Sequence, residues 1–379
     1  MSIRAFKYLS PLVLYLGSIT AFVGHGLICF APLMYAWVVI PGLELFIKPD
    51  PSNLNEAEEE VARQSKVYDY ILYLIVLLQM PTLFYFLYSM QDATLTVADK
   101  IGRVGTMGLL CGTFGVNVGH ELGHRVKPFE QILARISLLS SLYMHFVIEH
   151  NKGHHKNVAT PEDPSSARMG QPLYFFFLRS IFLTYVSAWK ISLTEIHKQQ
   201  KAFFRLSNEM LVFQLIQLTF VAIVFLAFGW KITLYFLAAA ILGILLSEMV
   251  NYIEHYGLER KQIAEGKYER AMPEHSWNSN HVIGRLMLFE LSRHSDHHYL
   301  ASRKYQVLRH HEYAPQMPTG YPGMMILSLV PPAWFSVMNP RVRKIKAEFY
   351  NDADYLPTRK RTPSVMVEAP SKLIPPEIE

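Results

Sequence analysis

The sequence contains little charge and almost no cysteine for its length. Only 18% of its 379 residues are Asp, Glu, Lys or Arg, whereas 51% are hydrophobic, and the mean hydropathy is +0.15. Ordinary soluble domains carry about 25% charged residues, so this balance argues for a polytopic membrane protein. The two cysteines, Cys29 and Cys111, both lie in apolar stretches, so we expect neither a disulfide framework nor a thiolate metal ligand.

Long apolar runs occupy much of the chain. A spanning helix needs roughly 20 predominantly apolar residues, and four runs approach this length: Val67 to Met90, Ile101 to Gly119, Met210 to Phe228 and Ile232 to Tyr252. The stretch from Leu9 to Ile47 is about twice the length of a span. It is interrupted by Gly24, Gly26, Pro32 and Pro41, which predicts a hairpin of two short spans. We therefore expect an all-α fold with six transmembrane helices.

The basic residues determine the expected orientation. Of 36 Lys and Arg, only Lys100, Arg103 and Lys231 fall in the two longer turns that a six-span arrangement places outside. The others lie on the side of the N-terminus, which is expected to be the cytoplasm because cytoplasmic loops carry an excess of basic residues. The apolar run after Arg4 is too long for a cleaved signal peptide. Nothing in the sequence indicates a nucleic-acid partner.

The segments between and after the spans predict a cytoplasmic helical cap. Gln131 to His150 has a helical apolar pattern, and Pro172 to His197 combines aromatic and basic residues as an interfacial amphipathic helix does. An apolar stretch from Met324 to Met338 contains too much proline for a seventh span. We expect residues 1–345 to form one membrane domain and the proline-rich, charged residues 346–379 to form a mobile tail.

Nine of the sixteen histidines fall into four clusters that follow apolar segments. Imidazoles three or four residues apart share a helix face and can bind one ion. Two clusters repeat the form H-x2,3-H-H, and this recurrence argues against chance. The candidate ligands, all on the expected cytoplasmic side, are His120, His124, His150, His154, His155, His255, His294, His297 and His298.

The clusters leave several kinds of metal site open. His120-Glu121-Leu122-Gly123-His124 satisfies the H-E-x-x-H signature of zinc proteases, in which Glu121 would be a general base. A catalytic zinc needs only three protein ligands, however, and the chain offers seven further clustered histidines. The adjacent His154 and His155 cannot face one way in a regular helix, so they suit two ions or a broken last turn at Gly153. Nine neutral nitrogens suffice for two ions, but imidazole alone does not select the metal.

Four carboxylates lie beside these candidate ligands in the sequence. A metal-bound imidazole usually donates its second N–H to a carboxylate or a carbonyl oxygen, which fixes the orientation of the ring. Some carboxylates next to the clusters are therefore expected to hold the histidines in place. The candidates are Glu121, Glu149, Glu254 and Asp296.

Five segments around the histidines form a specific pattern. They are His120-Glu-Leu-Gly-His-Arg, Glu149-His-Asn-Lys-Gly-His-His, Asn251-Tyr-Ile-Glu-His-Tyr-Gly, His275-Ser-Trp-Asn-Ser-Asn and Leu291-Ser-Arg-His-Ser-Asp-His-His. Ala159-Thr-Pro-Glu-Asp-Pro and Gly320-Tyr-Pro-Gly-Met fit the same pattern. Together they resemble the bacterial integral-membrane alkane 1-monooxygenases, which belong to the membrane fatty acid desaturase and hydroxylase superfamily. The resemblance extends from Leu9 to Val342.

This resemblance implies a centre of two non-haem iron ions held by the nine histidines. It also implies O2-dependent hydroxylation of medium-chain n-alkanes to 1-alkanols at the cytoplasmic side of the bacterial inner membrane. The n-alkane would enter from membrane lipid. Electrons would come from rubredoxin, which an NADH-dependent rubredoxin reductase reduces. Two alternatives are a related di-iron hydroxylase of alkyl aromatics or fatty acyl chains and, more distantly, a zinc intramembrane protease.

Two further functional roles follow from this interpretation. Arg293, Arg303, Lys304 and Arg309 surround the last cluster, and a small acidic iron–sulfur protein would be attracted to them. A positive-inside bias alone also produces a basic inner face, so both interpretations of these residues stay open. The alkane channel must end at a bulky side chain, for which Tyr35, Trp37 and Phe84 are candidates.

Overall fold

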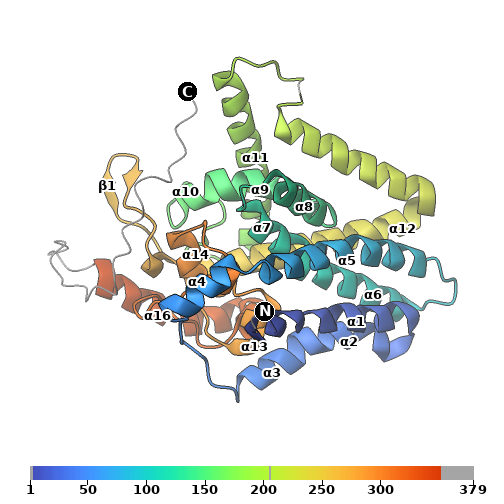
Figure 1. The fold of residues 1–379 in the computed structure, drawn as a ribbon, viewed down its shortest axis with the longest axis horizontal. Helices are drawn as coiled ribbons and strands as arrows, with labels where there is room; N and C mark the ends of the chain where they lie inside the picture. The colour runs from blue at the N-terminus through green and yellow to red at the C-terminus, as the bar shows by residue number, and fades with distance from the viewer. Residues whose placement is uncertain (1–2, 205, 351–379) are drawn as a thin grey trace.

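The computed structural model describes residues 3–204 and 206–350, and in this part of the chain nearly all regular structure is helical (Figure 1). The exception to the expected all-α fold is one antiparallel hairpin of two short strands, Gln262–Ala264 (β1) and Lys267–Tyr268 (β2). Gly266 turns this exposed hairpin with a φ of 64°, a conformation that favours glycine.

Apolar helices form the N-terminal third of the molecule. Their bounds are η1 (Ile3–Leu9), α1 (Leu12–Val23), η2 (Gly26–Phe30), α2 (Ala31–Met34), η3 (Tyr35–Val39), α3 (Ile40–Glu44), α4 (Glu56–Gln64) and α5 (Val67–Ser89). The segments Arg4–Val23 and Gly26–Glu44 are each long and apolar enough to cross a membrane, and so is α5. The chain reverses between the first two of them at Gly26, whose φ is 68°. The predicted helical hairpin is therefore present.

The middle of the chain begins with one continuous helical segment that includes a π-helical turn. It consists of α6 (Val97–Leu110), the π-turn η4 (Cys111–Val116) and α7 (Asn117–Gly123). Thr96 begins this segment by accepting a hydrogen bond from the Asp99 N–H at 3.1 Å. The helices that follow are α8 (Pro128–Leu139), α9 (Phe146–Glu149), the π-turn η5 (His150–His154), α10 (His155–Asn157) and α11 (Leu173–Lys198).

The single helix predicted for Gln131 to His150 is wrong. The chain turns between α8 and α9, where Leu142 adopts a φ of 52°. Contacts from a distant part of the chain hold this turn: the Tyr143 hydroxyl donates to Glu248 at 2.7 Å, and the Met144 N–H donates to Gln217 Oε1 at 2.9 Å. Both partners lie on one later helix, which local periodicity could not anticipate.

That helix, α12 (Glu209–His255), is 47 residues long and is the fourth helix of the described part that is long and apolar enough to cross a membrane. Gly229, with a φ of 80° and a ψ of 172°, breaks it into two arms that meet at a sharp angle (Figure 1). The two arms correspond to the separate spans predicted for Met210 to Phe228 and Ile232 to Tyr252. The predicted span over Ile101 to Gly119 is helical but is not among the four candidates.

Small residues bring the second arm of α12 close to α6 and η4. A Cβ added at Gly108 would lie 2.6 Å from Leu242 Cβ, and one added at Gly243 would lie 2.6 Å from Cys111 Cβ. Glycine at these crossing points lets the two backbones approach closely, as between helices in membranes. The close crossing brings the end of α12, with His255, near the end of α7, with His120.

The C-terminal part contains short helices and one longer helix. They are η6 (Pro273–His275), α13 (Val282–Met287), α14 (His294–Tyr299), η7 (Tyr305–Val307), α15 (Tyr321–Ser328) and α16 (Pro331–Tyr350). The apolar stretch from Met324 to Met338 is divided between α15 and α16 and does not form one long helix. Helix α16 continues over residues 346–350, which the sequence placed in the tail, and the rest of the predicted tail lies outside the described residues.

Candidate metal centre

The structure brings all nine clustered histidines together at one end of the helical bundle, in two groups. One group has five members and the other has four, and within each group the candidate ligand atoms all lie within 4.8 Å of one another. They come from α7 and the residue that follows it, from η5 and α10, and from the end of α12 and α14. The five-histidine group contains His120, His124, His150, His155 and His297, and the four-histidine group contains His154, His255, His294 and His298.

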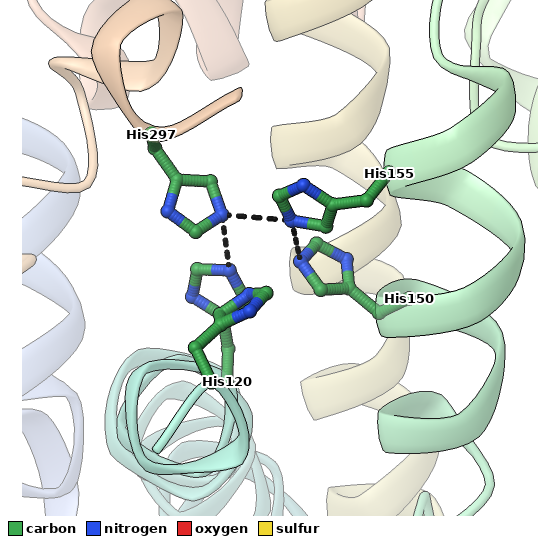
Figure 2. Close-up of side chains that lie close together, drawn as sticks. His120, His150, His155 and His297 are labelled. Atoms are coloured by element: carbon green, nitrogen blue, oxygen red, sulfur yellow. Dashed lines mark hydrogen bonds between the residues drawn. The ribbon is translucent and has the colours of Figure 1, made fainter. Parts of the chain in front are cut away.

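The spacing of the ring nitrogens fits shared metal ions. In the five-histidine group, His297 Nε2 lies 3.0 Å from both His120 Nε2 and His155 Nε2, and His155 Nε2 lies 3.0 Å from His150 Nε2 (Figure 2). A neutral imidazole has one N–H, so hydrogen bonds among these rings cannot satisfy every nitrogen. Two nitrogens bound at right angles to one ion, each at about 2.1 Å, are about 3.0 Å apart.

The four-histidine group has the same spacing. His294 Nε2 lies 3.1 Å from His255 Nε2 and 2.9 Å from His298 Nε2. The Nε2 atom of His154 is buried and has no hydrogen-bond partner. A buried nitrogen without a partner is costly unless a ligand occupies the position that it faces. Both donor sets therefore suit metal ions, and imidazole donors suit iron, zinc, copper and nickel alike.

The π-turn η5 determines which histidines meet. In a π-helix residue i pairs with residue i+5, so His150 and His155 come to the same face. An α-helix would instead have placed His154 below His150. His154 belongs to the four-histidine group, whereas His155 belongs to the five-histidine group. The structure therefore favours the alternative in which these adjacent histidines bind two different ions.

Burial prevails in eight of these nine rings and favours their neutral form, His154 being the exception. It lowers the pKa of His150, His294, His297 and His298 well below the ordinary value for histidine, and neighbouring imidazoles lower it further. Neutral imidazole is the form that binds a metal ion, because the ligand nitrogen must be deprotonated. At neutral pH the rings with a lowered pKa can therefore bind a metal ion without first losing a proton.

Asp163 is a site residue that the sequence analysis did not single out. Its carboxylate lies 2.9 Å from His154 Nδ1, and both side chains are fully buried. Burial disfavours the charged form of His154, but the Asp163 carboxylate more than offsets this effect and raises the pKa of His154. Ser165 N–H and the Ser166 hydroxyl donate to Asp163 at 3.0 and 2.6 Å and hold it in place. The only signal in the sequence was its position in Ala159-Thr-Pro-Glu-Asp-Pro.

Of the four carboxylates predicted to hold the histidines, Glu254 lies nearest to a ring nitrogen of the two histidine groups. Its Oε2 atom is 3.2 Å from His294 Nε2, and its Oε1 atom accepts a hydrogen bond from the Tyr321 hydroxyl at 2.8 Å. Glu121 instead accepts hydrogen bonds from Arg125 at 2.6 Å and from the Tyr305 N–H at 3.2 Å. A carboxylate that already accepts these two hydrogen bonds is poorly placed to act as the general base of a protease.

The other two predicted carboxylates contact neighbours of the metal centre. Glu149 accepts a hydrogen bond from Ser187 at 3.3 Å, and burial raises the pKa of Glu149 to about 8. Asp296 accepts hydrogen bonds from Arg303 at 2.6 Å and lies 2.8 Å from His311 Nε2. These contacts hold in place the segments that carry the candidate ligands.

The four basic residues predicted to bind an electron donor all have partners within the chain. Arg293 is buried and donates to the carbonyl oxygens of Ser52 and Leu308, so we exclude it from a docking surface. The other three are partly exposed and form ion pairs: Arg303 with Asp296, Lys304 with Asp69 and Arg309 with Glu59. Each pair reduces the net charge that these residues can offer to a partner.

An apolar cavity that is partly open to the surroundings leads to the two histidine groups. His120, His150 and His294 line this cavity together with Glu254, and its walls include Trp37, Leu109, Val116, Phe146, Leu246 and Met325. Of the three residues considered for closing a channel, Trp37 lines this cavity, whereas Tyr35 and Phe84 do not. Such a cavity suits an apolar ligand whose end reaches the ring nitrogens.

Comparisons with known proteins agree with this arrangement. A model of the fatty acid desaturase family matches residues 103–328. The sequence is 38% identical to alkane 1-monooxygenase 2 of Pseudomonas aeruginosa over 323 residues, which cover 82% of this chain and 85% of that protein. This chain belongs to the alkane 1-monooxygenases of the fatty acid desaturase family. The resemblance inferred from its histidine segments is confirmed.

Two further relatives show which group of monooxygenases this family member resembles more. It is 37% identical to the alkane 1-monooxygenase of Acinetobacter baylyi, over 85% of this chain and 79% of that protein. It is 27% identical to the hydroxylase component of the xylene/toluene monooxygenase of Pseudomonas putida, over 64% of each chain. The alkane 1-monooxygenases are thus clearly the more similar group.

Proposed function

We propose that this protein is an alkane 1-monooxygenase that hydroxylates the terminal methyl group of medium-chain n-alkanes with O2 and gives 1-alkanols. The observation that carries this proposal is the apolar cavity that reaches two groups of histidines. An alkane offers no charge and no hydrogen bond, so only a long apolar cavity can bind it. The names of the relatives at 37% and 38% identity support the same reaction.

We assign one iron ion to each histidine group, with five histidines for one ion and four for the other. Bound iron would supply the activation of O2, which no side chain can perform. The chain itself positions the substrate: apolar walls such as Leu246 and Phe146 hold the alkyl chain, and His120, His150 and His294 mark where the terminal methyl group stops. The same walls exclude water from the end of the cavity.

Product and metal analysis of the purified, reduced protein tests this function. We expect octane to give 1-octanol and the active protein to contain two iron ions per chain. Xylene and a medium-chain fatty acid assayed beside octane distinguish the related hydroxylases, since a clear preference for either would replace the alkane assignment. A protein that binds a single zinc ion and hydroxylates none of the three would contradict the proposal.

We further propose six membrane spans, with the metal centre at the cytoplasmic face of the inner membrane. The four long apolar helices give five spans, because Gly229 divides α12 into two arms. The helical segment from α6 to α7 would be the sixth. In this arrangement the metal centre lies on the side that carries most of the basic residues, which favours the cytoplasm.

We propose that rubredoxin, reduced by its NADH-dependent reductase, docks over the five-histidine group. His124 and His155 are the two members of the centre that are only half-buried, so electrons have the shortest route there. Lys156 is exposed and directly follows His155. The partly exposed Arg303, Lys304 and Arg309 would frame this surface, although their internal ion pairs weaken their attraction for an acidic partner.

Reversing the charge at Lys156 tests this docking surface. We expect Lys156→Glu to slow reduction by rubredoxin at low salt, because a repulsive charge lowers the rate of encounter, and we expect the difference to shrink at high salt. Lys344→Glu, at an exposed lysine on α16, is the matched control and should reduce normally. Equal rates for both variants at low salt would remove Lys156 from the docking surface.

A further inference from the structure

Helix α11 and its connection to α12 form an exposed element beside the metal centre. Figure 1 shows α11 at a steep angle to α5 and α6, with its C-terminal end directed away from the body of the molecule. Although rich in apolar residues, α11 is not among the helices suited to cross a membrane. Phe175, Leu178 and Phe182 are each more than 60% exposed along it. Their spacing of three or four residues gives α11 one apolar face towards the surroundings.

An aromatic cluster lies at the C-terminal end of this helix. The ring of Trp189 stacks on Phe203, with centroids 6.2 Å apart and an angle of 12°, and Phe203 contacts the edge of Phe204 at 4.9 Å. Phe204 is 85% exposed and Leu206 is 89% exposed. Three residues later the chain enters α12, a candidate span, so in the proposed six-span arrangement these side chains lie at the level where that span leaves the membrane. Tryptophan concentrates at this level in membrane proteins.

Three lysines lie close to the aromatic cluster in the sequence and have no acidic partner in the described part of the chain. Lys190, Lys198 and Lys201 are exposed, and none of them forms an ion pair with a carboxylate in residues 3–204 or 206–350. The two nearest acidic residues in the sequence are already paired, Glu195 with Lys152 and Glu209 with Arg135. The element therefore combines a local positive charge with apolar side chains at membrane level.

We propose that Lys190, Lys198 and Lys201, with Phe204 and Leu206 inserted beside them, form a binding site for the headgroups of anionic phospholipids. The lysines would contact the lipid phosphate groups, and the apolar side chains would enter the acyl region next to them. Direct continuity with α12 favours the membrane surface over a soluble partner. The proposal rests on the membrane location in the proposed function, but it is tested without any measurement of hydroxylation.

This site would also stabilise the metal centre, because α11 supports the π-turn and the histidine that follows it, which together carry three of the ligands. Lys152 in that turn pairs with Glu195 of α11 at 2.7 Å, and Ser187 of α11 donates to Glu149 at 3.3 Å. A lipid surface that holds the end of α11 in place therefore restrains His150, His154 and His155 through these contacts.

Fluorescence quenching by brominated lipids tests the proposal on the full chain in nanodiscs. The Trp189 signal is the difference between the unaltered protein and Trp189→Phe, since the chain has five tryptophans. We expect brominated phosphatidylglycerol to quench this signal at a lower mole fraction than brominated phosphatidylcholine. Each lysine should contribute about a fivefold preference at low ionic strength, and the preference should fall as salt is added.

The double variant Lys198→Gln/Lys201→Gln should lose most of this preference, whereas Lys267→Gln/Lys344→Gln, which removes two exposed lysines elsewhere, should retain it. Equal quenching by both lipids, or no quenching by either, would overturn the proposal. The same applies if Lys198→Gln/Lys201→Gln leaves quenching unchanged but weakens reduction by an acidic electron carrier, because the lysines would then bind a protein. Loss of hydroxylation alone would bear on the proposed function and not on this site.

Discussion

Replacing His294 with alanine is expected to abolish hydroxylation and to lower the iron content from two ions to one per chain. His294 Nε2 lies within 3.1 Å of two other ring nitrogens of the four-histidine group, so its loss removes a central ligand. Even residues that only support a metal ligand typically contribute 10- to 100-fold to affinity or activity, so we expect a loss of more than about 100-fold. Iron analysis and octane turnover of the purified variant measure both effects.

The grouping of the histidines sharpens this experiment. His297→Ala should also leave one iron ion, since His297 belongs to the five-histidine group, and the double variant His294→Ala/His297→Ala should contain none. His197→Ala, at an exposed histidine on α11, is the control and should retain two ions and full activity. If a normally folded His294→Ala protein keeps both ions, His294 is not a ligand; if it loses both, the two groups do not bind independently.

Replacing Asp163 with asparagine is expected to weaken iron binding by the four-histidine group roughly 10- to 100-fold. The carboxylate lies 2.9 Å from His154 Nδ1 in a fully buried contact, where it fixes the ring so that Nε2 points into the group. An asparagine of the same shape removes the negative charge that makes His154 a better donor. Competition with a chelator, followed by the iron retained per chain, measures the affinity of this group separately from turnover.

The neighbouring Glu162 provides a matched control for this change. Glu162 is exposed, and its contact with the Tyr268 hydroxyl is 3.4 Å long. Glu162→Gln therefore removes a carboxylate from the same loop without altering the histidines and should retain both ions. Equal iron loss in the two variants would indicate a general effect on the loop, and no loss in Asp163→Asn would show that His154 needs no carboxylate.

Local sequence determines the helices of this protein well but not its turns. The apolar runs are long enough that a helix within a membrane is the simplest way to satisfy their backbone, and the hairpin over residues 9–47 followed from its glycines and prolines. The turn between α8 and α9 was missed because it depends on Glu248 and Gln217, which lie 105 and 73 positions further along the chain than their partners in the turn. The hairpin β1–β2 carries no long apolar pattern, so no signal indicated it.

In the metal centre, too, local sequence determined some features and the tertiary structure determined others. The sequence alone predicted which nine histidines meet, because imidazoles clustered at helical spacing after apolar segments are typical of a metal site. Their division into two groups depends on the fold, since the π-turn η5 moves His155 to the face of His150 and leaves His154 to the other group. Tertiary contacts also pair His154 with Asp163 and bring the Tyr305 N–H to Glu121 as a hydrogen-bond donor. Sequence periodicity describes one regular helix, whereas these arrangements require a change of helical register and segments that meet only in the folded chain.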